Sequence, residues 1–226
     1  MTLDARHRDI ARIALAAAGR RYGVAFAGGG ALQVHDVSAR RTQDVDLFVR
    51  KARNVVKAAG VIAGALERAG YRVEAVSADV PGWAEVSQEL REFEVYPPDG
   101  GDPVQVQVAF FAYTGTVATD VGPVVTLDYL AARKAVALME RHRVRDYIDI
   151  ASLADAGYEI TQLLDMAFAE EPSLTAEDAG DAGAHLDQVA DERLARELPP
   201  GKTPDWVRAA LAGWPRHPVH ADDPLG

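Results

Sequence analysis

The sequence contains no cysteine, and this absence excludes several chemistries. Without thiols the chain cannot form disulfides, use a cysteine nucleophile or hold zinc through sulfur. It also has no apolar run long enough to cross a bilayer, and its first residues lack the basic-then-apolar order of a signal peptide. We therefore expect a cytoplasmic protein with no membrane partner.

Positive charge is scarce as well. The 24 lysines and arginines are outnumbered by 34 aspartates and glutamates, which gives a formal net charge of −10. This balance argues against a general nucleic-acid-binding protein, because such binding needs a basic surface. The basic residues nevertheless gather in two clusters, within residues 40–57 and 133–145, whereas acids crowd the C-terminal third. Each basic cluster suits a triphosphate or an RNA end.

The first motif is a glycine triplet, Gly28, Gly29 and Gly30, which follows a short apolar stretch at residues 24–26. Glycines let a backbone turn approach a phosphate closely and present bare N–H groups to it. The flanking patterns predict a strand before the triplet and a helix over residues 31–37 after it. We therefore interpret the triplet as a phosphate-binding turn.

A pair of carboxylates follows, because Asp44 and Asp46 alternate with apolar residues at the start of a predicted strand over residues 45–49. Alternate residues of a strand share one face, so the two acids lie together. Like charges placed this way destabilise a strand unless they are neutralised, and a bound Mg²⁺ or Mn²⁺ would do so. The alternative is a strand at a sheet edge with two solvated acids.

The remaining pattern predicts a mixed α/β fold in two parts, residues 1–125 with a mixed sheet and flanking helices and residues 126–226 mostly helical. A proline- and glycine-rich turn at residues 97–101 predicts a β-hairpin. The other elements that we expect are helices at 6–18 (with Gly19 as the stop), 54–69, 127–140, 143–154, 161–168, after 175 and at 206–212, and strands at 71–76, 93–96 and 104–111.

A second constellation lies on the predicted helix over residues 127–140, where Lys134 falls on the same face as Leu130 and Leu138. A buried ammonium is costly without a partner, so Lys134 should meet a carboxylate or the phosphates of a ligand in a cleft between this helix and the sheet. Alternatively, its stem covers the core while its charge reaches water.

In the next predicted helix Arg145, Asp146 and Asp149 share one arc, opposite an apolar stripe. They could form an exposed ion-pair cluster. They could equally line the same cleft as Lys134, with one acid assisting a metal or accepting the proton of an acceptor hydroxyl. The spacing alone leaves both possibilities open.

With these motifs the chain resembles the AbiEii-type nucleotidyltransferase toxin family of the polymerase-β-like superfamily. The likeness extends over about residues 24–153 and includes a Gly-Gly-x-Ala-Leu turn, an Arg-x-Thr/Ser-x-Asp-x-Asp strand, an inward lysine and an Arg-Asp-x-x-Asp helix. It implies the glycine triplet as phosphate turn and the two strand aspartates as metal ligands. The other residues that it implies are Lys134 as a phosphate contact, Asp146 as a further acidic site residue, and Arg41, Thr42, Arg145 and Asp149 as nucleotide-binding residues.

The chain departs from this pattern at two places. The hydroxyl residue usual after the paired glycines is replaced by Gly30, which removes one donor to the triphosphate. Related enzymes commonly carry a third carboxylate on a neighbouring strand, where this chain offers Gln105 and Gln107. An amide is a poor Mg²⁺ ligand and cannot act as a base.

The resemblance implies an enzyme that transfers a nucleoside monophosphate from a nucleoside triphosphate to an acceptor hydroxyl and releases pyrophosphate. The expected acceptor is the 3′ end of tRNA, the expected cofactor Mg²⁺ or Mn²⁺, and the expected partner a cognate antitoxin protein. Two alternatives remain. One is an enzyme acting on a small cationic acceptor such as an aminoglycoside, which the net charge favours. The other is a catalytically silent nucleotide-binding module.

Overall fold

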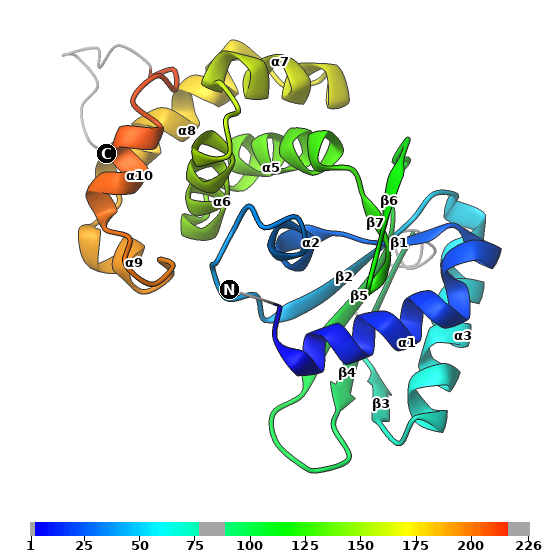
Figure 1. Ribbon diagram of the computed structural model, residues 1–226. Coiled ribbons are helices and arrows are strands. Elements are labelled where there is room, and N and C mark those ends of the chain that lie inside the picture. The colour runs from blue at the N-terminus through cyan, green and yellow to red at the C-terminus, as the bar shows by residue number, and fades with distance from the viewer. Residues whose placement is uncertain (1–2, 77–88, 217–226) are drawn as a thin grey trace. The chain divides into compact units, whose positions relative to one another are not determined.

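The computed structural model describes residues 3–76 and 89–216 of the chain. The chain divides into two compact units, Met1–Leu130 and Ala131–Gly226. The first unit contains a sheet flanked by helices, and the second consists of helices (Figure 1). None of the helices in these two described stretches is long and apolar enough to cross a membrane.

A seven-stranded mixed sheet in the order β3-β4-β5-β2-β1-β7-β6 forms the first unit and confirms the predicted mixed α/β fold. The central strand β2 pairs in parallel with β5 and antiparallel with β1, and β1 pairs in parallel with β7. The strands are β1 (Val24–Phe26), β2 (Asp44–Val49), β3 (Arg72–Ala75), β4 (Leu90–Tyr96), β5 (Val104–Phe110), β6 (Thr116–Thr119) and β7 (Gly122–Val125).

Helices α1 (Ala5–Tyr22) and α3 (Val55–Arg68) cover one face of this sheet, and the short helix α2 (Gly28–Val34) lies on the other (Figure 1). A 3₁₀ turn, η1 (Ala52–Asn54), precedes α3. The period-two pattern of β2 sets its orientation, because Val45, Leu47 and Val49 are fully buried while the residues between them are half-buried. One face of β2 thus belongs to the core, and the other bears its polar side chains.

The structure departs from the sequence-based expectation at the end of the first helix, and it contains a hairpin that was not predicted. The first helix continues through Gly19, which is buried against the Pro123 ring, and ends at Gly23, whose φ of 66° is the left-handed conformation that glycine adopts readily. The β6–β7 hairpin was not predicted, since β6 is short and exposed and Pro123 interrupts β7 as a strand pattern. β7 is nonetheless a neighbour of β1 inside the sheet.

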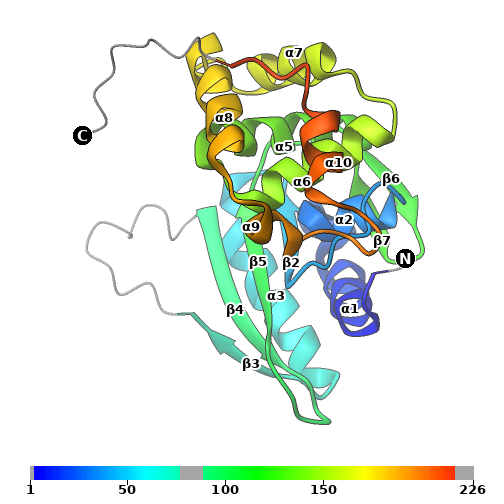
Figure 2. The same ribbon diagram turned by 90° about the vertical axis from the view of Figure 1, so that its left-hand side faces the viewer.

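The second unit confirms the predicted helical region (Figure 2). Buried donors tie its helices together, because Tyr147 Oη donates to the Ala182 carbonyl at 2.7 Å and Trp214 Nε1 donates to the Ala179 carbonyl at 2.8 Å. Its helices are α6 (Val144–Asp155), α7 (Ile160–Glu170), α8 (Ala176–Gln188), α9 (Asp191–Ala195) and α10 (Pro204–Ala210). Helix α5 (Leu127–Arg141) begins in the first unit and continues into the second.

Candidate functional site

Asp44 and Asp46 lie on the polar face of β2, at the start of the strand, and both are half-buried. The alternative of a sheet edge was wrong, because β2 has partners on both sides. Two carboxylates on an interior strand have fewer waters to solvate them than on an edge. A divalent cation bound at this position would offset the repulsion between the two carboxylates.

The neighbouring strands extend the polar face of β2 sideways. Asp46 is paired in register with Gln107 of β5, and Gln107 is paired with Glu92 of β4. The Gln107 amide donates from Nε2 to Glu92 Oε1 at 2.7 Å. The position beside Asp46 therefore holds an amide, as the sequence indicated, and the nearest carboxylate in this row is one strand further away.

Gly28 brings the backbone directly against Asp46. Its φ is +63°, and a side chain there would overlap Asp46 Oδ2, with a Cβ only 2.8 Å from the Asp46 Cβ. The preceding residue is tied to the same strand residue, since the Ala27 N–H donates to the Asp46 carbonyl at 2.9 Å. The glycine triplet is thus the first turn of α2 itself, not a turn that precedes a helix starting at residue 31, as the sequence had suggested.

Gly29 faces Arg40, whereas the sequence-based prediction named the next residue, Arg41, as nucleotide-binding. A Cβ on Gly29 would lie 3.0 Å from Arg40 Nη2 and 3.3 Å from Thr42 Oγ1. Arg40 is only 7% exposed and donates from Nη1 to the Arg41 carbonyl, whereas the Arg41 side chain is exposed. The available signal was the spacing Arg-x-Thr-x-Asp-x-Asp, whose arginine is Arg40.

The packing around Gly30 explains why this chain has no hydroxyl residue at position 30, where the family pattern has one. A Cβ at this position would overlap the tip of the Phe26 ring and lie 3.2 Å from Cε1 and 3.3 Å from Cε2 of the same ring. Phe26 is completely buried, so the ring has little room to move. The space that a hydroxyl side chain would need at residue 30 is therefore filled by Phe26.

This packing makes the effect of Gly30→Ala depend on Phe26. We expect Gly30→Ala to lower the free energy of unfolding by about 1–3 kcal/mol, because overpacking outweighs the gain of about 1 kcal/mol in helix propensity. In a Phe26→Leu background the same change should be neutral or stabilising. Guanidinium denaturation of the four proteins of this cycle measures the coupling, and equal effects of Gly30→Ala in both backgrounds would contradict it.

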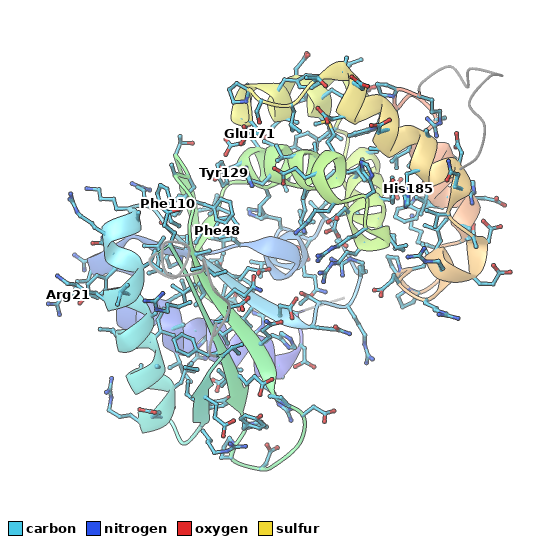
Figure 3. All side chains as sticks on the ribbon, turned by 180° about the vertical axis from the view of Figure 1, so that it is seen from behind. Arg21, Phe48, Phe110, Tyr129, Glu171 and His185 are labelled. Atoms are coloured by element: carbon cyan, nitrogen blue, oxygen red, sulfur yellow. The ribbon has the colours of Figure 1, made fainter. Side chains whose placement is uncertain are left out.

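An aromatic cluster lies beyond the carboxylates on the same strand. The Phe48 and Phe111 rings have centroids 4.1 Å apart. Phe48 also meets Tyr129 edge-on, with centroids 6.5 Å apart, and Figure 3 labels both of these residues. Tyr129 also contacts Tyr113, at 6.4 Å. These rings give the end of the polar face an apolar wall.

In the helical unit, Lys134 forms an ion pair with Asp149, with Nζ 2.6 Å from Oδ2. The lysine side chain is 13% exposed and that of Asp149 only 1%, so the carboxylate partner expected for a buried ammonium is present. The alternative of an exposed ion-pair cluster on this helix was wrong. Residues 146–153 of α6 are all buried, and only the ends of the helix reach solvent; Tyr147 packs against α8 through its hydrogen bond to the Ala182 carbonyl.

Asp146 is the second buried acid of α6. Its Oδ1 accepts from Arg141 Nη2 at 3.0 Å, whereas Oδ2 is buried with no hydrogen-bond partner in the described part of the chain. Burial raises the pKa of Asp146 above its ordinary value, although the positive charges of Arg141 and Lys134 oppose the shift. Burial thus favours the neutral form of Asp146 more than it is favoured in a solvated aspartate.

The donors on the polar face of β2 fit a divalent cation that completes its shell elsewhere. No group of three or more histidine, aspartate or glutamate side chains placed to hold a metal occurs within residues 3–76 and 89–216. Mg²⁺ usually binds through one or two carboxylates and takes its other ligands from water and substrate phosphates. Asp44 and Asp46 meet that requirement.

Comparison with known proteins identifies the family. The family described as "Nucleotidyl transferase AbiEii toxin, Type IV TA system" matches residues 10–212. Among solved structures, the chain is similar to the nucleotidyltransferase toxin MenT4 of Mycobacterium tuberculosis H37Rv, with a TM-score of 0.61, 15% identity, and coverage of 91% of this chain and 82% of that one. It is also similar to JHP933 of Helicobacter pylori, with a TM-score of 0.60, 13% identity, and coverage of 94% and 91%.

Identities this low establish a shared fold, and no match was found among curated protein sequences. The family match extends over most of the chain and includes both the glycine and aspartate motifs of the sheet and the basic and acidic residues of α5 and α6. The chain therefore belongs to the AbiEii nucleotidyltransferase toxins of type IV toxin–antitoxin systems.

Proposed function

We propose that this nucleotidyltransferase uses Mg²⁺ or Mn²⁺ and transfers a nucleoside monophosphate to the 3′ end of tRNA. The observation that carries the proposal is the juxtaposition of Asp44 and Asp46 with the backbone at Gly28. It offers two cation ligands and a turn without side chains at the same place. Positioning and charge neutralisation are what phosphoryl-group chemistry chiefly requires.

Each part of this arrangement has a role. Asp44 and Asp46 hold the cation, which when bound polarises the phosphate under attack. The backbone N–H groups of Gly28, Gly29 and Gly30, in the first turn of α2, are our candidates for contacts with the β- and γ-phosphates. Thr42 and the buried guanidinium of Arg40 lie behind Gly29 and give this turn a positive, hydrogen-bonding wall, with Arg41 as an exposed basic neighbour.

The helical unit supplies the second group of proposed residues. Lys134 is our candidate for a contact with the nucleotide phosphates, and its ion pair with Asp149 orients the ammonium. Asp146 is our candidate for the residue that accepts a proton from the acceptor hydroxyl, because a raised pKa makes its carboxylate a stronger base than an ordinary aspartate. Arg145 is included as a nucleotide-binding residue on the family motif alone.

A cognate antitoxin protein is the proposed partner, since the family is defined by such pairs. A small cationic acceptor is the second candidate substrate, and a specific surface favours it. An open groove of the first unit begins at Thr42, Asp44 and Gln105. It is lined by four further acids, Asp4, Asp9, Asp99 and Asp102, against two arginines, Arg6 and Arg41. Such a charge balance favours a cation over a polyphosphate.

The test is to incubate the purified chain with Mg²⁺, each α-labelled nucleoside triphosphate and either total tRNA or an aminoglycoside mixture. We expect label in tRNA with one of the nucleotides, and we expect the yield to fall steeply with salt if the basic clusters contact the RNA backbone. Label in the aminoglycoside fraction alone would contradict tRNA as the acceptor and support the small cationic acceptor instead.

Asp44→Asn and Asp46→Asn are the inactive controls. Glu67→Gln is the matched control, because Glu67 is an exposed acid of α3, on the opposite face of the sheet, and its loss removes the same charge. Transfer should disappear in the first two proteins and persist in the third. Transfer that survived both asparagine variants would contradict the assignment of these aspartates to the reaction.

A further inference from the structure

The polar face of β2 continues across two more strands. Asp46, Gln107 and Glu92 occupy paired register positions on β2, β5 and β4, so their side chains emerge on the same face. Adjacent strands are about 4.8 Å apart, which places the Gln107 amide between the two acids. Its only hydrogen bond within the described residues is the one from Nε2 to Glu92 Oε1, at 2.7 Å.

This hydrogen bond determines which way the amide faces. An ionised carboxylate has acceptors and no donor, so the Gln107 atom that contacts Glu92 must be the nitrogen. The amide oxygen then lies on the other branch of the same planar group, directed away from Glu92. The neighbour of Gln107 on that other side is Asp46.

We propose that Gln107 Oε1 is a neutral third protein ligand of the cation held by Asp44 and Asp46, and that Glu92 is the positioning residue that holds the amide in this orientation. The inference rests on the proposed function only in taking these aspartates as the cation site. It gives Glu92, on the strand beyond Gln107, a role in cation binding, and it explains how the Gln107 amide can stand in for an acid.

The chemistry of the pair compensates for the weakness of an amide ligand. Carbonyl oxygens of glutamine side chains bind hard cations, though less strongly than carboxylates. Donation to a carboxylate polarises the amide and makes its oxygen more negative, in the same way that an outer-shell acid strengthens a metal-bound histidine. Gln107 and Glu92 together therefore supply part of the missing negative charge while keeping the third full charge two strands away from the aspartates.

A neighbouring row of the same sheet provides a matched control. Asp44 is paired with Gln105, and Gln105 is paired with Glu94, which repeats the pattern of an aspartate, a glutamine and a glutamate. Here, however, Glu94 accepts from Tyr96 Oη at 2.6 Å. Glu94→Gln thus removes an acid from the same strand and face without releasing Gln107.

The experiment is isothermal titration of Mn²⁺ into the full chain without nucleotide, with denaturation midpoints to verify folding. Gln107→Leu should weaken Mn²⁺ binding by about tenfold or more, and Glu92→Gln by about tenfold, since loss of an outer-shell partner typically costs 10–100-fold. Glu94→Gln should stay within about twofold, because only a screened charge is lost. The double variant Glu92→Gln/Gln107→Leu should bind no more weakly than Gln107→Leu alone.

A variant in which residues 92 and 107 are exchanged should restore Mn²⁺ binding. In Glu92→Gln/Gln107→Glu the hydrogen bond is kept with its direction reversed and the acid moves beside Asp46, so Mn²⁺ affinity should return at least to the wild-type value. A general loss of packing would not be repaired in this way. The inference is overturned if Gln107→Leu binds Mn²⁺ like the wild type, or if Glu94→Gln weakens binding as much as Glu92→Gln does.

Asp44→Asn separates this inference from the proposed function. If Asp44→Asn binds Mn²⁺ as tightly as the wild type, the cation site itself is wrong, and both proposals fail. If Asp44→Asn loses binding while Gln107→Leu and Glu92→Gln keep it, the site stands and only the roles of Gln107 and Glu92 are wrong.

Discussion

Gly28→Ala is expected to abolish nucleotidyl transfer and to lower the free energy of unfolding by several kcal/mol. The left-handed conformation alone costs a residue with a Cβ about 1–2 kcal/mol. The larger effect is steric, because the new methyl group would overlap Asp46 Oδ2 and lie 2.8 Å from the Asp46 Cβ. Either the Asp46 side chain turns away or the first turn of α2 withdraws from β2. Both responses separate the cation ligands from the glycine turn.

The measurements are label transfer to the acceptor and guanidinium denaturation. Gly60→Ala is the control, since Gly60 lies in α3, is exposed and has no atom within 4 Å of the added Cβ. That variant should be more stable by up to about 1 kcal/mol and fully active. A Gly28→Ala enzyme with wild-type turnover would show that the close approach of Gly28 to Asp46 is irrelevant to the reaction.

Local periodicity was enough to predict most of the sheet. The alternation of Asp44 and Asp46 with buried valine and leucine fixes which face of β2 is polar, and the structure has that face. What the sequence could not supply was proximity between distant segments. The overlap at Gly28, the space that Phe26 fills against Gly30 and the bond between Gln107 and Glu92 all depend on strand order and register.

Besides proximity, periodicity predicted poorly how deeply the acids of α6 are buried. Asp146 and Asp149 lie opposite the apolar stripe of α6, which on a helix with one solvent face would leave them exposed. Residues 146–153 of α6 have no such face, so both acids are buried and must be compensated within the protein. For α5 the sequence did indicate that a buried charge needs a partner, because Lys134 lies in an apolar stripe. That partner is Asp149.

Lys134→Met is expected to reduce stability by about 3–5 kcal/mol, because it removes the ammonium partner of the Asp149 side chain, which is only 1% exposed. Asp149→Leu should cost a similar amount for the complementary reason. The double variant Lys134→Met/Asp149→Leu removes both charges and should recover most of the loss, since buried ion pairs are often replaceable by apolar residues of similar volume. Denaturation of the four proteins measures the coupling.

The Lys202–Asp155 pair provides the control, because it has the same 2.6 Å separation but side chains that are 37% and 48% exposed. Lys202→Met should cost no more than about 1 kcal/mol. Activity then distinguishes the two possible roles of Lys134. If the lysine binds nucleotide phosphates, the restabilised double variant remains inactive and binds nucleoside triphosphate weakly. If the ion pair only holds α5 to α6, activity returns together with stability, and Lys134 must be removed from the proposed reaction.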